Sequence, residues 1–147
     1  MYDRILVATD GSTTAQRASA HAVEVARLSG AAIHAVYVIE TRTGYDNAIV
    51  DPDVVHQNFR DEGEAALAAI EEQAGSDLAV TTAIREGVPH QELLAYADEN
   101  GIDLVVMGSE GRSAFKTILL GSTTEALLHS ATVPVLVVDG QDPPDPP

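Results

Sequence analysis

Apolar residues along the chain form short runs separated by segments of helical periodicity. The runs are rich in branched side chains and are bounded by turn residues, as buried strands are. They span residues 2–10, 31–40, 78–87, 102–109 and 134–139. We therefore expect these five segments to be the strands of the fold.

The segments between the runs predict helices. Ser12 is placed to cap a first helix that ends at Gly30. Pro89 suits the first turn of a third helix that ends at Asn100-Gly101, and Gly121-Ser122 opens a last one. The expected buried face of the first helix is Ala15, Ala18, Ala22, Val25 and Leu28. That of the long second helix, which ends near Gly75, is Val55, Phe59, Gly63, Leu67, Ile70 and Ala74.

This order of elements predicts an α/β fold. Strands that alternate with helices of such length imply right-handed crossovers and a parallel sheet. We expect a single doubly wound parallel sheet of five strands, covered by helices on both faces. A chain of 147 residues fits one domain, which we assign to residues 1–140. Residues 141–147 are proline-rich and acidic and should form a disordered tail.

The charge of the chain is strongly negative. Acidic residues outnumber basic ones by 23 to 8, Lys116 is the only lysine, and the formal net charge is −15. Nucleic acid is therefore not an expected partner. Acidic residues in place of lysine are typical of proteins from salt-accumulating microorganisms, where dense salt screens the repulsion between carboxylates. We expect a halophilic archaeon as the source, and an ordinary acidic bacterial protein is the alternative.

The start of the chain and its composition exclude several classes of protein. The opening MYDRILVATDGS reaches Asp10 after too few apolar residues for a signal peptide or a membrane span, so we expect a soluble cytoplasmic protein. The sequence has no cysteine, which excludes disulfides, thiolate metal sites and a cysteine nucleophile. Metal-ligand spacing does not occur among the histidines, which are His21, His34, His56, His90 and His129.

Glycines interrupt the pattern after the fourth strand, at Gly108, Gly111 and Gly121. Glycine lets a ligand reach backbone N–H groups that a Cβ would cover, and a helix N-terminus nearby favours an anion. Ser122 and Thr123 add hydroxyl donors. In a doubly wound sheet these residues lie at the carboxyl edge, where ligands bind. The spacing therefore predicts a polyphosphate site.

Ordinary structural roles for the same residues stay open. Ser122 and Glu125 have the spacing of a capping box, in which the serine caps the last helix and the glutamate reaches back. Gly121 as a simple turn residue and Asp10 as the cap of the first helix are further alternatives. Arg112 is either a phosphate contact or a solvated loop residue.

The sequence resembles the universal stress protein family, in its nucleotide-binding branch. The resemblance rests on Thr9-Asp10-Gly11-Ser12, Tyr37-Val38-Ile39-Glu40, the signature Gly108-x-x-Gly111-x9-Gly121-Ser122 and the ending ILLGSTTEALLHSATVPVLVV. It implies a flavodoxin-like sheet with strand order 3-2-1-4-5 and ATP, with magnesium or manganese, across the carboxyl edge. It also implies a homodimer joined through the last strand.

The resemblance implies site residues as well. Asp10 would contact the ribose or the metal, and the backbone of Val38 would bond to the adenine edge. Glu110 departs from the family pattern, which commonly has histidine or arginine there, and a carboxylate disfavours a nearby triphosphate. The expected nucleotide contacts are Thr9, Asp10, Val38, Met107, Gly108, Gly111, Arg112, Gly121, Ser122 and Thr123.

Three kinds of function fit these observations. The first is an ATP-binding regulatory module of the stress response, whose nucleotide changes its choice of an unknown protein partner. The second is a weak ATPase or autophosphorylating phosphotransferase, with Ser122 and Thr123 as acceptor hydroxyls. The third is a nucleotide-free dimeric interaction module. Efficient turnover of ATP is not expected, because the P-loop pattern GxxxxGK[ST] and a nucleophile–base pair are both missing from the sequence.

Overall fold

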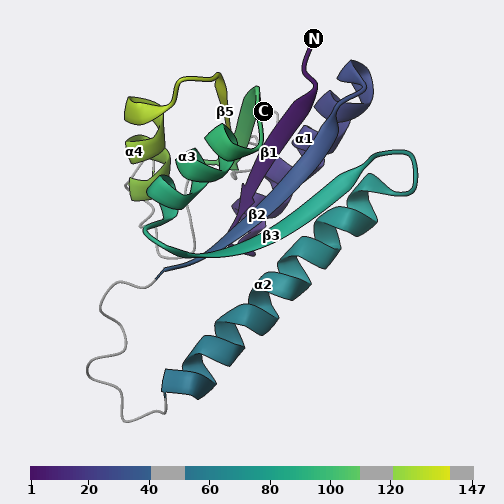
Figure 1. The fold of residues 1–147 in the computed structure, drawn as a ribbon. Coiled ribbons are helices and arrows are strands. Elements are labelled where there is room, and N and C mark those ends of the chain that lie inside the picture. The colour runs from purple at the N-terminus through teal and green to yellow at the C-terminus, as the bar shows by residue number, and fades with distance from the viewer. Residues whose placement is uncertain (41–51, 110–120, 140–147) are drawn as a thin grey trace, which may run out of the picture.

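The fold alternates strands and helices as the apolar pattern predicts. The computed structural model describes residues 1–40, 52–109 and 121–139, and Figure 1 shows them as a ribbon. The elements are β1 (Arg4–Thr9), α1 (Thr13–Ser29), β2 (Ala32–Glu40), α2 (Pro52–Ala74), β3 (Val80–Gly87), α3 (Pro89–Glu99), β4 (Leu104–Gly108), α4 (Ser122–Ser130) and β5 (Val135–Val138). Each strand lies within its predicted run. The expected tail, residues 141–147, lies outside the described residues.

The strands form one parallel sheet in the order β3-β2-β1-β4-β5, which confirms the predicted order. The ladder of β1 with β2 runs from the pair Arg4–Ala32 to the pair Thr9–Tyr37. On its other side β1 pairs with β4. From β1 the chain adds β2 and β3 on one side of the sheet, and from β4 it adds β5 on the other side. The direction of winding therefore reverses between β1 and β4.

Helices cover both faces of the sheet (Figure 1), with α1 and α2 on one face and α3 and α4 on the other. Successive side chains of a strand point to opposite faces. Ile5 and Val7 accordingly pack in the core under α1 and α2, while Leu6 packs in the core under α3 and α4. Burial on both faces explains why the strand runs are almost continuously apolar.

The first helix has the predicted ends but not all of the predicted buried face. The Ser12 hydroxyl accepts a hydrogen bond from the Ala15 N–H at 3.1 Å, and Gly30 ends the helix with φ of 71°. Leu28 is 90% exposed, so its predicted burial is wrong. Ala26, which is fully buried, continues the apolar stripe, and Leu28 lies about 200° round the helix from it.

The long helix α2 crosses the sheet closely at one point. A Cβ built on Gly63 would lie 2.7 Å from Cδ1 of the buried Tyr37 ring, so the helix backbone rests directly on that ring. Leu67, Ile70 and Ala74 continue the predicted face and are buried, and Phe59 packs at its margin. The side chain of Val55 is not among those described.

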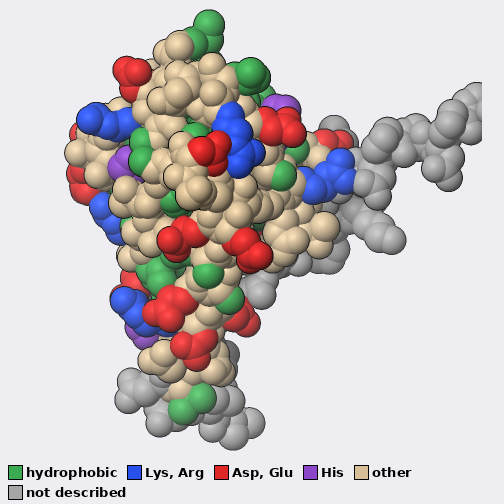
Figure 2. Space-filling model, turned by 90° about the vertical axis from the view of Figure 1, so that its right-hand side faces the viewer, with side chains coloured by type: hydrophobic (Ala, Val, Ile, Leu, Met, Phe, Trp, Pro, Cys, Tyr) green, Lys and Arg blue, Asp and Glu red, His purple; other side chains and the backbone are tan. Residues whose placement is uncertain are grey.

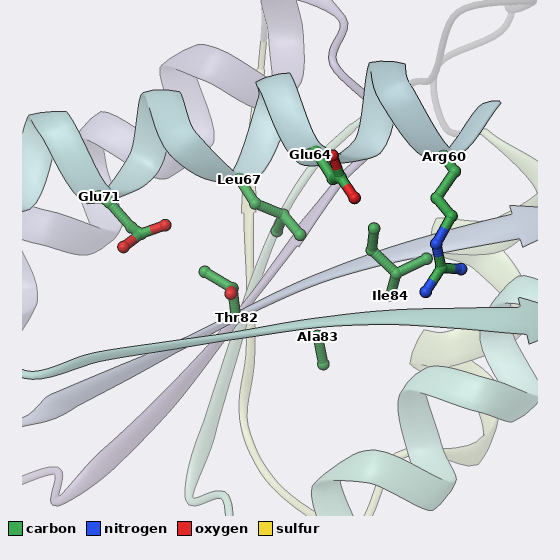
Figure 3. Close-up of a pocket in the computed structure, with 7 residues that line it drawn as sticks. All are labelled: Arg60, Glu64, Leu67, Glu71, Thr82, Ala83 and Ile84. Atoms are coloured by element: carbon green, nitrogen blue, oxygen red, sulfur yellow. The ribbon is translucent and has the colours of Figure 1, made fainter. Parts of the chain in front are cut away.

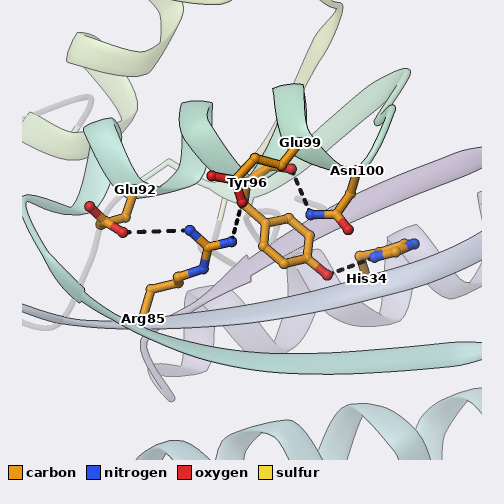
Figure 4. A network of polar contacts seen from close by, with 6 residues as sticks. All are labelled: His34, Arg85, Glu92, Tyr96, Glu99 and Asn100. Carbon is orange, nitrogen blue, oxygen red and sulfur yellow. Dashed lines mark hydrogen bonds and ion pairs between the residues drawn. The ribbon is translucent and has the colours of Figure 1, made fainter.

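A polar network holds α3 on the other face (Figure 4). The hydroxyl of buried Tyr96 lies 2.7 Å from Nδ1 of His34 on β2, and the guanidinium of Arg85 on β3 lies 5.1 Å from the Tyr96 ring centre. Arg85 also donates to Glu99 at 2.6 Å. Burial, and to a smaller degree the charge of Arg4, lower the pKa of His34 below its usual value. The network links one helix to two strands.

Within residues 1–40, 52–109 and 121–139, no helix is both long and apolar enough to span a bilayer.

Candidate functional site

The turn after β1 directs the N-terminus of α1 to the carboxyl edge of the sheet. Gly11 has φ of 81°, a value that glycine adopts without strain, and its N–H donates to Thr9 Oγ1 at 3.1 Å. The Ser12 N–H donates to Asp10 Oδ1 at 2.9 Å. Ser12 itself holds the cap position, so the alternative of Asp10 as the helix cap is wrong.

The end of β4 lies between the first turns of two helices. A Cβ built on Gly108 would lie 2.6 Å from Cγ2 of Thr14 in α1, so the missing side chain lets that helix pack against the strand. The Thr124 hydroxyl of α4 donates to the Gly108 carbonyl at 2.9 Å. Thr14 and Thr124 are both buried. The positive ends of two helix dipoles therefore meet at the switch between β1 and β4.

Ser109 connects this strand end to the start of α4. Its N–H donates to the Val138 carbonyl of β5 at 2.9 Å, and its carbonyl accepts from the Gly121 N–H at 2.6 Å. Gly108 and Gly121, separated along the sequence, are thus neighbours at the edge of the sheet. The predicted position at the carboxyl edge is thus confirmed for these two glycines.

The alternative of a capping box at the start of α4, with Ser122 as the cap, is wrong. The Glu125 N–H donates to the Gly121 carbonyl at 3.0 Å, which makes Gly121 the cap and Ser122 the first residue of the helix. Ser122 is exposed at this position and Thr123 is half-buried. Their hydroxyls and the first backbone N–H groups of α4 lie together at the carboxyl edge.

The backbone of Val38 lies at the same edge. The Ala32 N–H donates to Asp3 ahead of β1, whereas the Ile33 N–H donates to Ala79 ahead of β3. Backbone groups of successive strand residues alternate in direction, so those of Val38 face the β1 side. The ladder with β1 ends one residue earlier, at the pair Thr9–Tyr37. The Val38 carbonyl therefore points past the last ladder pair, towards the space next to the β1 turn.

The other predicted site residues differ in which of their groups could contact a ligand. Met107 packs its side chain in the core with Leu127, so only its backbone faces the edge. Thr9 is buried, and its hydroxyl is engaged in the turn after β1. Gly111, Arg112 and the atypical Glu110 lie outside the described residues.

The donor groups of the edge suit an anion better than a bare metal ion. Helix N-termini and hydroxyls are phosphate ligands, whereas a divalent cation needs several oxygen ligands. In the described part of the chain, no cluster of three or more His, Cys, Asp or Glu side chains is arranged to hold a metal. Asp10 would therefore hold magnesium only together with oxygens of a bound phosphate.

The contacts of Thr14 and Thr124 at Gly108 were not among the predictions. The signal is nevertheless visible in the sequence, because the letters GSTT occur at both Gly11–Thr14 and Gly121–Thr124. Each copy opens a helix at the carboxyl edge, and the second threonine of each reaches Gly108. The two copies of GSTT thus mark two helix starts that contact the same residue, Gly108.

Comparison with known sequences identifies the family. The model of the universal stress protein family matches residues 1–139. The chain belongs to this family. Among its relatives, universal stress protein MJ0531 of Methanocaldococcus jannaschii is 32% identical over 140 residues, which cover 94% of this chain and 82% of the relative. YxiE of Bacillus subtilis is 30% identical, with 94% and 99% covered.

Solved structures agree with this assignment. The structure of hypothetical protein MJ0577, determined for a structure-based assignment of biochemical function, has a TM-score of 0.85 at 30% identity and covers 97% of this chain and 99% of its own. A universal stress protein solved in complex with cAMP has a TM-score of 0.73 at 26% identity, with 95% and 99% covered. Both structures share the fold of this chain over more than nine-tenths of its length.

Proposed function

We propose that this universal stress protein binds ATP across the carboxyl edge of β1 and β4 and acts as a nucleotide-dependent regulatory module of the stress response. One observation carries the proposal: the first turns of α1 and α4 meet at Gly108, at the point where the winding of the sheet reverses. Two helix N-termini at a topological switch point favour an anionic ligand.

Each part of the nucleotide has a matching group. Phosphates would take the backbone N–H groups of Ser122 and Thr123, and the missing side chain of Gly121 leaves room for their approach. Asp10, half-exposed beside the α1 cap, would contact the ribose or a magnesium or manganese ion shared with the phosphates. The adenine edge would bond to the Val38 backbone. Gly111 and Arg112 complete the proposed contacts.

A related protein supports nucleotide as the class of ligand, since a universal stress protein 26% identical to this chain was solved in complex with cAMP. The proposal requires ATP in the same compartment, which is why we place the protein in the cytoplasm. It also includes assembly as a homodimer through β5, and an unknown protein partner that distinguishes the nucleotide-bound form.

A weak phosphotransferase is the second candidate, and the position of Ser122 favours it. The hydroxyl of Ser122 is exposed in the first turn of α4 instead of serving as the helix cap. A triphosphate held by that turn would bring a phosphoryl group close to this hydroxyl. Transfer would form a phosphoserine and release ADP.

Nucleotide analysis and calorimetry of the purified protein separate these candidates. ATP released on denaturation, with saturable heat on titration of nucleotide-free protein with ATP and magnesium, supports the regulatory module. ADP together with phosphoserine supports the phosphotransferase. Protein that carries no nucleotide and gives no heat with ATP would contradict the proposal and leave the interaction module.

A further inference from the structure

A groove of about 350 Å³ lies between α2 and β3, apart from the residues of the nucleotide edge. Figure 3 shows Arg60, Glu64, Leu67 and Glu71 of α2 facing Thr82 and Ile84 of β3 across it. The side chains of Leu67 and Ile84 also pack at the core under α2. The groove therefore has an apolar floor with charged groups on its helical wall.

The groove runs beside an open edge of the sheet. β3 is the first strand in the sheet order and, among the described residues, pairs only with β2. The Ile33 N–H bonds to the Ala79 carbonyl, so the backbone of Ala79 faces β2. Because direction alternates along a strand, the backbone groups of Thr82 and Ile84 face outward. Thr82 and Ile84, which line the groove, thus also present their N–H and C=O groups along the edge.

One end of β3 is tied to α2 through a side chain. Glu86, the next residue whose backbone faces outward, contacts His56 of α2 through its carboxylate. This contact lies near the end of β3, beyond the residues that line the groove. The part of the edge that adjoins the groove is therefore the stretch around Thr82 and Ile84.

Charge selects the kind of partner that fits. Glu64 and Glu71 flank Leu67 along the wall of the groove, and Arg60 lies at one end (Figure 3). Asp and Glu side chains also gather on the lower part of the molecule in Figure 2, where α2 lies. With a net charge of −15 on the chain, the field around this edge attracts cations. An acidic segment would be repelled, and a purely apolar one would leave the carboxylates without partners.

We infer that the β3 edge and the adjoining groove bind an extended, basic segment of a partner protein as an added strand. Strand addition uses main-chain hydrogen bonds for affinity and side-chain pockets for specificity. Apolar side chains of the segment rest on Leu67 and Ile84, while lysine or arginine side chains reach Glu64 and Glu71. The inference does not depend on nucleotide binding, because the two sites share no residue.

The test uses the full-length chain and a synthetic peptide of alternating lysine and valine, followed by fluorescence anisotropy. Glu71→Gln removes a groove carboxylate, and Glu72→Gln is the matched control, because Glu72 is its exposed neighbour and does not line the groove. We expect Glu71→Gln to weaken binding about two- to fivefold and Glu72→Gln to leave it unchanged. Equal effects of the two substitutions would overturn the inference.

A second peptide of the same composition, with its lysines and valines in two blocks, separates strand pairing from general attraction. It should bind more weakly than the alternating peptide, and equal affinity would contradict strand addition. Hydrogen exchange followed by NMR should show that the alternating peptide protects the amides of Thr82 and Ile84. Unchanged exchange at both amides would also contradict it.

A second copy of this chain is the competing occupant of the edge. Thr82→Pro removes an outward N–H that an added strand would use, a change that edge strands tolerate. In peptide-free protein this variant should keep the molecular mass of the parent in light scattering. A lower mass would show that the edge is an interface between copies and would overturn the inference.

Discussion

Gly108 and Gly121 meet at the carboxyl edge, but they are glycines for different reasons. Gly108 lacks a side chain because Thr14 occupies the position of its Cβ, so a substitution there would disturb the packing of α1. Gly121 has φ of −69° and ψ of 159°, which any residue can adopt. Of these two glycines, Gly121 is therefore the one at which the ligand site can be tested without disturbing the packing of α1.

We expect Gly121→Val to abolish ATP binding while the fold is retained. The added branches would fill the space that phosphates need in front of the first N–H groups of α4. Calorimetric titration with ATP and circular dichroism measure the two effects. Thr132→Val, at an exposed position ahead of the amino end of β5, is the control and should bind ATP with the affinity of the parent protein. Unchanged ATP affinity in folded Gly121→Val would remove this glycine from the site.

Gly63 makes a second close contact, between α2 and the Tyr37 ring. Alanine favours a helix by about 1 kcal/mol over glycine, but overpacking costs about 1–3 kcal/mol, so we expect Gly63→Ala to lower the free energy of unfolding by about 1 kcal/mol. Urea denaturation gives the value. Ala68→Gly, at an exposed position of the same helix, measures the propensity contribution alone. A gain in stability from Gly63→Ala would show that the ring moves aside freely.

At the scale of elements, the sequence predicts the strands and most helix ends correctly, because these depend on local periodicity and on capping residues such as Ser12 and Gly30. The last helix opens at Gly121-Ser122 as predicted, but the alternative with Ser122 as its cap is wrong, since the Gly121 carbonyl accepts the first helical bond and the sequence cannot show which residue does so. The role of Gly108 in packing was also not predictable, because it depends on a contact with Thr14, far away in the chain. Strand order came from the family resemblance and not from the periodicity.

The network around α3 predicts a dependence of stability on pH. His34 has its pKa lowered in the folded chain, so the unfolded chain binds a proton first as the pH falls. The contribution of His34 to stability is present above the pKa of 6.5 in the unfolded chain, and it is lost as the pH falls to the pKa in the folded chain. Between about pH 7.5 and 5, stability should therefore decrease less in His34→Gln than in the parent. His21→Gln, at an exposed position of α1, should behave like the parent, and equal slopes in all three proteins would exclude His34 as the cause.

The edge strand β5 is the expected interface between two copies. The Val105 N–H bonds to the Pro134 carbonyl and the Ser109 N–H to the Val138 carbonyl, so the backbone of Val137 faces outward. Val137→Pro removes an outward N–H without cutting the ladder to β4, and it should convert a dimer to monomers in light scattering. Thr82→Pro, on the opposite edge strand, is the matched control. A dimer that persists in Val137→Pro would place the interface elsewhere.

At the scale of the whole molecule, the dominant feature is the net charge of −15. In the proposed site two helix N-termini would attract a triphosphate at contact, while the carboxylates spread over the surface would repel it from a distance. These effects differ in range, so salt separates them. The halophilic origin remains a prediction of the composition. A protein adapted to high salt should also bind ATP more tightly as the salt concentration rises.

We expect the affinity for ATP to rise with salt at a fixed excess of magnesium. At about 0.01 M ionic strength charges act over roughly 30 Å, whereas at about 1 M the range is roughly 3 Å. High salt therefore screens the distant carboxylates, while the backbone donors of α4 would still act on a bound phosphate at contact, as would the proposed contact of Arg112. Circular dichroism must accompany each titration, because self-repulsion at low salt also opposes folding. If affinity falls steadily with salt while the protein stays folded, the positive field at the two helix starts outweighs the charge of the whole molecule, as it does in a basic phosphate site.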